Sequence, residues 1–176
     1  MIRRRIEEVS ERIEQRPWYQ RVDPAIRSWM RRNGLTLLRV SLGVVFLWYG
    51  VLKLVPGLSP AEALATDTIR AITFGALPDR MIGVVLGTWE LIIGVGLLTG
   101  WMMRLVLLLL FLQMPGTFLP VFLFTDRVFE IVPFVPTIEG QYIFKNLILI
   151  SAGIVLGGFL EKDPMGGVQT PNGKQE

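Results

Sequence analysis

Five polar side chains interrupt long apolar stretches of this sequence, and their chemistry is the first question it raises. They are Arg39, Lys53, Glu90, Gln113 and Lys145. An ionised group inside a bilayer costs about 3 kcal/mol on insertion scales, so such groups pair with one another or mark a ligand or proton site. We therefore treat these five residues as candidate intramembrane polar or ligand-binding positions.

Two of the apolar stretches carry the same spacing of glycines and charged residues. Arg39, Gly43, Phe46, Gly50 and Lys53 follow each other at steps of 4, 3, 4 and 3, as do Gly83, Gly87, Glu90, Gly94 and Leu97. This spacing places each set on one face of a helix. We expect Gly43 and Gly50 to face Gly87 and Gly94, because small residues let membrane helices approach closely.

The depths of the charged residues predict a first contact. Arg39 lies about 6 Å above the inner boundary of its stretch, and Glu90 lies near the midplane of the next. We expect Arg39 to contact Glu90, directly or through water. Such a contact could be a structural ion pair between two helices or part of a ligand or proton site.

The other three polar residues leave two interpretations each. Lys53 and Lys145 lie near the outer boundary, where each could extend to the headgroups or Lys145 could pair with Glu139. Together with Gln141 and a helix start, they could instead bind an anion or a quinone carbonyl. Gln113 precedes Pro115, where we expect a kink or partial unwinding. It would bond to a neighbouring helix or line a small cavity.

Composition excludes several kinds of chemistry. The chain has neither cysteine nor histidine, so it cannot itself ligate an iron–sulfur cluster, haem or a typical zinc ion. We find no metal-binding spacing, phosphate loop or catalytic triad, predict no catalytic residue, and favour a protein that is not itself an enzyme. Any redox carrier would be organic, such as a quinone. A net charge of +3 gives no indication of nucleic-acid binding.

The apolar stretches predict an all-α integral membrane four-helix bundle. With 51% hydrophobic residues, residues 35–160 contain four stretches of spanning length, at about 35–55, 81–100, 102–124 and 142–160. A capping box at Ser59 predicts a short surface helix ending near Phe74, and residues 125–141 are expected to form a loop, with 128–132 extended.

The remaining segments flank the bundle. Residues 1–34 are basic and amphipathic, typical of a cytoplasmic or interfacial helical segment. We expect one helix to end at Pro17 and a second to run from Asp23–Pro24 to Asn33–Gly34. Residues 161–176 predict a flexible polar tail.

The distribution of basic residues predicts the orientation. With both termini on one side, that side carries twelve Arg and Lys residues and the other side three. The positive-inside rule then places both termini in the cytoplasm.

The spans resemble those of the DoxX-like superfamily of small four-helix membrane proteins of bacteria and archaea. The resemblance rests on Arg39, Gly43, Phe46, Gly50 and Lys53, then on Glu90, Gly94 and Gly100; residues 136–158 are similar to the last helix of one branch. It implies a place in the cytoplasmic membrane and in complexes linked to redox stress or to quinone-coupled sulfur oxidation, such as thiosulfate:quinone oxidoreductase. It implies no agreed catalytic residues.

Three hypotheses follow from these observations. The first is an accessory or assembly subunit of a redox-linked membrane complex, with protein partners or a homo-oligomer in the bilayer. The second is a quinone-linked oxidoreductase subunit with the quinone near Lys53, Lys145, Glu90 and Gln113. The third is a small proton-coupled transporter gated by Arg39 and Glu90.

Overall fold

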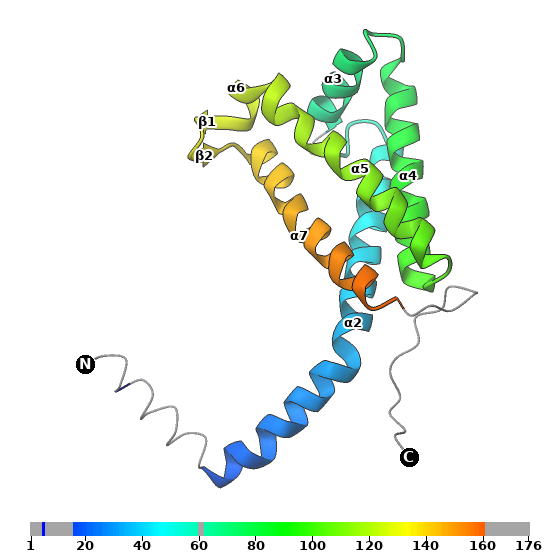
Figure 1. Ribbon diagram of the computed structural model, residues 1–176. Helices are drawn as coiled ribbons and strands as arrows, with labels where there is room; N and C mark the ends of the chain where they lie inside the picture. The colour runs from blue at the N-terminus through cyan, green and yellow to red at the C-terminus, as the bar shows by residue number, and fades with distance from the viewer. Residues whose placement is uncertain (1–4, 6–15, 60–61, 161–176) are drawn as a thin grey trace. The chain divides into compact units, whose positions relative to one another are not determined.

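The computed structural model describes residues 5, 16–59 and 62–160, so the expected helix before Pro17 and the expected flexible tail lie outside the described residues. The chain divides into two units, Met1–Leu37 and Leu38–Glu176, which we describe separately. Among these described residues, four helices are long and apolar enough to cross a membrane (Figure 1). The predicted all-α membrane fold is confirmed.

Helix α2 (Pro17–Leu54) has no break at Asn33–Gly34, so the expected helix end there is wrong. The side chain of Asn33 donates to the carbonyl of Trp29 one turn earlier, at 2.9 Å, which keeps it within the helix. One glycine costs a helix only about 1 kcal/mol relative to alanine, too little to end it. Pro24 also lies inside α2, because the helix begins seven residues earlier than expected.

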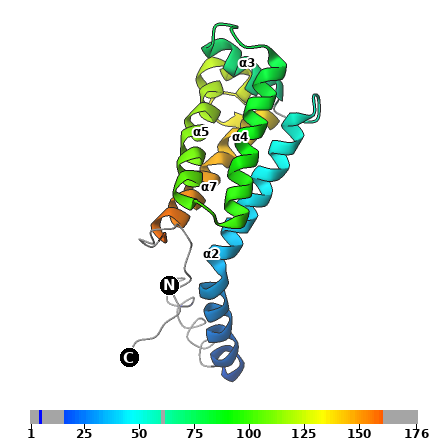
Figure 2. The same cartoon turned by 90° about the vertical axis from the view of Figure 1, so that its right-hand side faces the viewer.

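In the second unit, α2 and α4 (Asp79–Thr99) run side by side (Figure 2). A methyl group on Gly94 would lie 2.6 Å from the backbone nitrogen of Leu47, and one on Gly87 would lie 2.9 Å from the carbonyl oxygen of Gly50. Gly43 lies against Gly94 in the same way. The glycines therefore allow two helix backbones to touch, which any side chain would prevent.

Helix α5 (Met103–Leu123) follows α4 after a three-residue turn and packs against α4 and α7 (Ile138–Gly158). The turn uses a left-handed backbone at Gly100, φ 74°, and at Met102, φ 49°. Ile93, Leu97, Met103 and Leu110 are fully buried where these helices meet. Helix α5 is continuous through Pro115 and Pro120, so the expected unwinding does not occur.

Two short helices and a hairpin connect or cover the spans at one end of the bundle. Helix α3 (Glu62–Ile72) packs on α4 and α5, and Phe74 and Gly75 follow it with positive φ angles. Between α5 and α7 lie α6 (Thr125–Val128) and an antiparallel hairpin of β1 (Phe129–Ile131) and β2 (Val135–Pro136). The expected loop is therefore an ordered helical turn and hairpin.

Helix α7 begins four residues earlier than predicted, at Ile138 rather than at residue 142. Thr137 caps it: its side-chain oxygen accepts a hydrogen bond from the backbone nitrogen of Gly140 at 3.1 Å. Threonine is a preferred N-cap because it satisfies a backbone donor that the helix leaves free. Lys145 is consequently two turns into the helix.

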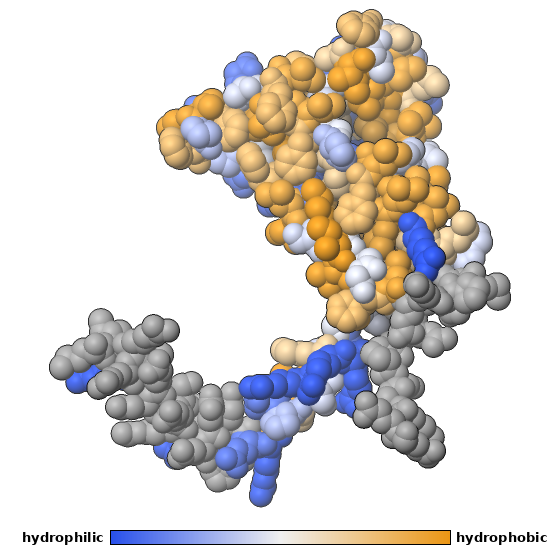
Figure 3. Space-filling view, viewed as in Figure 1, coloured by the Kyte–Doolittle hydropathy of each residue, from blue (hydrophilic) through white to orange (hydrophobic). Residues whose placement is uncertain are grey.

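The face drawn in Figure 3 is mostly hydrophobic over α5 and α7. Leu108, Leu112, Leu147 and Ile148 are each more than half exposed. In water such a surface would be unfavourable, but a lipid bilayer accepts it. The four spanning helices thus imply a bilayer environment.

We predict that Gly94→Ala destabilises the bundle by about 1–3 kcal/mol, since the added methyl group meets backbone rather than a flexible side chain. The measurement is the midpoint of denaturant unfolding in detergent. Gly116→Ala is the matched control, because nothing lies within 4 Å of a methyl group there. Equal midpoints for the two variants would contradict the close packing of α2 on α4.

Candidate functional site

One cavity of about 590 Å³ lies among α2, α3, α4, α5 and α7. Four of the five polar residues singled out in the sequence line it: Lys53, Glu90, Gln113 and Lys145. The rest of the lining is mainly apolar and includes Phe46, Trp89 and Ile143. Pockets of roughly 300–1,000 Å³ with a few polar groups on apolar walls are typical of small-molecule sites.

Glu90 joins the polar residues of this cavity into one cluster, which we call the polar centre (Lys53, Glu90 and Gln113). Lys53 Nζ lies 2.5 Å from Glu90 Oε2, and Gln113 Nε2 donates to Glu90 Oε1 at 2.8 Å. Only 15% of the Lys53 side chain and 10% of the Glu90 side chain are exposed. Gln113 Oε1 is buried without a hydrogen-bond partner, so the centre retains one free acceptor.

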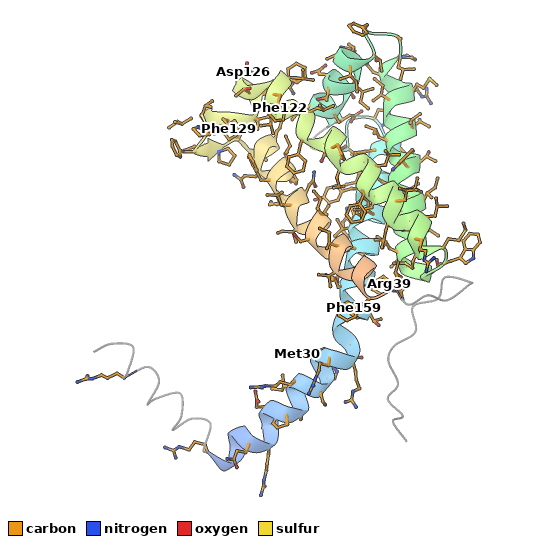
Figure 4. All side chains as sticks on the ribbon, in the orientation of Figure 1. Met30, Arg39, Phe122, Asp126, Phe129 and Phe159 are labelled. Carbon is orange, nitrogen blue, oxygen red and sulfur yellow. The ribbon has the colours of Figure 1, made fainter. Side chains whose placement is uncertain are left out.

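The expected contact between Arg39 and Glu90 is wrong. Arg39 instead donates to the carbonyl oxygens of Leu97 and Leu98, at 2.7 and 3.2 Å. It lies near the C-terminal end of α4 (Figure 4) and does not line the cavity. Arg39 thus satisfies two carbonyls that the end of α4 leaves without helical partners.

The direction of helical side chains explains this choice of partner. The Cα–Cβ bond of a helical residue tilts toward the N-terminus of its helix. In antiparallel α2 and α4, this tilt points Lys53 and Glu90 toward each other and Arg39 and Glu90 apart. Lys53 therefore extends inward along the helix to the carboxylate, not outward to the headgroups.

Lys145 occupies the exposed edge of the cavity. Its Nζ lies 5.0 Å from the centroid of the Tyr142 ring, a distance suited to a cation–π contact. The alternative pair with Glu139 is not formed, since Glu139 contacts Arg127. The expected contribution of a helix start beside Lys145 is also wrong, because α7 begins seven residues earlier, and Gln141 does not line the cavity.

The sequence did not single out Arg127, which connects α3, α6 and α7 beside the cavity. Its guanidinium donates to Asp67 at 2.7 Å and lies 3.3 Å from Glu139. The hydrogen bond that Arg127 donates to Asp67, with the charge of Glu139, raises the pKa of Arg127 above its ordinary value. No local pattern indicates this residue, because its partners are 60 and 12 positions away.

This network positions α3 as one wall of the cavity. Leu64, Thr68 and Ile72 on α3 line it, and Asp67 on the same helix bonds to Arg127. Arg70 also pairs with Asp79 at the start of α4. Asp67 and Arg70 also contact each other at 3.5 Å, so one connected set of ion pairs ties this wall to α6 and to the start of α4.

A sequence model of the DoxX family matches residues 34–125. The chain belongs to the DoxX family. The matched region contains Arg39 and the whole polar centre, whereas Lys145 follows it. No curated protein and no solved structure matches the chain.

The chemistry available at the polar centre is hydrogen bonding and charge stabilisation. Its ammonium and amide donors converge on one carboxylate, and an amide oxygen is free to accept. Among the described residues, no three His, Cys, Asp or Glu side chains group as metal ligands. The arrangement suits an uncharged, largely apolar ligand with one or two polar oxygen atoms.

We predict that Glu90→Leu lowers the free energy of unfolding by about 3 kcal/mol, because it leaves the Lys53 ammonium buried without a partner. Adding Lys53→Met should recover much of this loss, since the double variant buries no charge. Denaturant unfolding in detergent measures the free energies of unfolding of the unaltered protein, the two single variants and the double variant, which together form a double-mutant cycle. Simple addition of the two single effects would contradict the ion pair.

The same cycle with Arg39 tests the corrected pairing. Arg39→Gln and Glu90→Leu do not share a contact, so we expect their effects to add within about 0.5 kcal/mol. A coupling as large as that between Lys53 and Glu90 would restore the original expectation.

For the exposed network, Arg127→Gln should cost only about 1 kcal/mol, because its ion pairs are about one-third exposed. A raised arginine pKa contributes stability that is present below the ordinary value and is lost only as pH rises through the raised one. The loss of unfolding free energy in Arg127→Gln should therefore be constant at every pH, from acidic to mildly basic, at which Asp67 and Glu139 are ionised. It should shrink at about 1 M salt, where the screening length is about 3 Å. Unfolding midpoints at low and high salt check this, with Arg80→Gln as an exposed control.

Proposed function

We propose that this DoxX family membrane protein binds a quinone in its cavity, as a subunit of a redox-linked membrane complex. The observation that carries the proposal is the polar centre on the wall of a mainly apolar cavity of about 590 Å³. A quinone has the matching composition, with an apolar ring and two polar oxygen atoms. A bound quinone would supply two-electron, two-proton chemistry.

The residues present fit this ligand in both of its redox forms. Gln113 Oε1 is an unsatisfied buried acceptor, which a hydroxyl of the reduced form could satisfy. The Lys53 ammonium could donate to a carbonyl of the oxidised form while it retains Glu90. A buried polar atom without a partner costs about 1–3 kcal/mol, and a ligand that satisfies it recovers that cost.

Membership of a larger complex completes the proposal. A quinone exchanges electrons with a donor, and this chain has no cysteine or histidine to hold a metal centre. The donor would therefore belong to a partner protein, which combines the accessory-subunit and quinone hypotheses. The transporter hypothesis loses its proposed gate, because Arg39 and Glu90 do not meet.

The orientation remains part of the proposal. With both termini in the cytoplasm of a bacterial or archaeal cell, the cavity end with α3 and Arg127 would face the outer side. A quinone in the bilayer would then meet its partner near that surface.

Fluorescence titration with a short-chain benzoquinone in detergent tests the ligand, because Trp89 lines the cavity. We expect saturable quenching that weakens about tenfold in Gln113→Leu, the effect of losing one buried hydrogen bond of about 1.4 kcal/mol. Trp89→Phe should remove most of the saturable signal.

Gln141→Leu is the matched control, since Gln141 is exposed and does not line the cavity. Organic extraction of the purified protein should also yield a quinone. Linear, unsaturable quenching of the unaltered protein, or equal affinity in Gln113→Leu and Gln141→Leu, would contradict the proposal. Co-purification of a partner at fixed stoichiometry without a quinone would favour an accessory role alone.

A further inference from the structure

The hairpin between α6 and α7 carries an apolar tip. Residues 131–138 contain no charged side chain. Ile131 is 61% exposed, Val132 58%, Phe134 82% and Ile138 73%. Contiguous exposed residues of this kind mark a contact surface rather than scattered surface apolarity.

The backbone of the tip needs few hydrogen bonds from water. Pro133 and Pro136 have no N–H group. Phe134 donates its N–H to the carbonyl of Ile131 at 2.8 Å, and Thr137 donates to that of Val128 at 2.9 Å. The tip can therefore leave water at low cost, whereas unpaired backbone groups would oppose this.

The base of the hairpin is fixed to the bundle. Val128 is fully buried and Phe129 is 8% exposed. The rings of Phe129 and Phe144 lie 5.7 Å apart between centroids. The base is therefore part of the packed core, and the tip is held away from it.

The last turn of α5, which leads into the hairpin through α6, is also apolar and exposed. Phe122, near the end of α5, is 79% exposed and lies near the hairpin base (Figure 4). Along the direction of the spans, the hairpin lies level with the first turns of α4, on the opposite side of the bundle, and not beyond the turn that joins α3 to α4 (Figure 1). This places the tip beside the bundle rather than beyond its end.

We propose that the tip of the β1–β2 hairpin inserts into the bilayer at the boundary between headgroups and acyl chains. The two strands leave backbone groups on their outer edges, which favours this boundary over the hydrocarbon centre. The tip anchors the end of the bundle that contains α3 and Arg127. The proposal is independent of what the cavity binds.

Spin-label accessibility in liposomes tests the proposal, and the absence of native cysteine makes single-cysteine variants direct. Phe134→Cys and Val132→Cys are labelled at the tip. Leu108→Cys on α5 is the lipid reference and Asp126→Cys on α6 the water reference; both residues are exposed. Each label is probed with oxygen, which partitions into lipid, and with a water-soluble nickel chelate.

We expect both tip labels to show a ratio of oxygen to nickel accessibility close to that of Leu108→Cys and well above that of Asp126→Cys. A ratio matching Asp126→Cys would place the tip in water and overturn the proposal. Protection from both reagents would show that protein covers the tip, which would also overturn it. Unchanged helical circular dichroism confirms that each labelled variant is folded.

Discussion

The contact between the backbones of α2 and α4 sets the register on which the cavity depends. Gly43 lies against Gly94, and Gly50 lies against Gly87. Since the helices are antiparallel, Arg39, four residues before Gly43, lies level with Leu98, four residues after Gly94. Arg39 therefore meets the carbonyl end of α4, as its hydrogen bonds show. The same register brings Lys53 within reach of the carboxylate.

The ion pair of Lys53 and Glu90 need not make the fold more stable than apolar residues at the same two positions would. Well-packed apolar residues in place of a buried pair are often neutral or stabilising, whereas loss of one partner is costly. Gln113 adds a third polar side chain and leaves one oxygen unsatisfied. In the proposed quinone site, that oxygen would accept a hydrogen bond from the ligand.

The sequence predicts the spans and the glycine faces well, because apolar length and small-residue spacing are local patterns. It also contains enough to find the pair of Lys53 and Glu90. The assumed facing of the glycines fixes the register, and the tilt of helical side chains points these two residues together. Depth alone predicts the wrong partner, since it places Arg39 within reach of Glu90 but takes no account of where the two side chains point. Arg127 could not have been found this way, because its partners come from helices that only folding brings together.

The buried polar centre and the exposed edge of the cavity differ in how well they tolerate amino-acid substitutions. Replacing Lys53 or Glu90 alone leaves a buried charge without its partner, so the two residues constrain each other. Lys145 is exposed and contacts only the face of Tyr142 among the interactions described for it, so its replacement costs little stability. The centre also lies within the region that matches the DoxX family, and Lys145 lies beyond it. In the proposed quinone site, the residues that would bind the polar oxygen atoms therefore lie within the region that matches the DoxX family, whereas the cavity edge supplied by α7 lies beyond it.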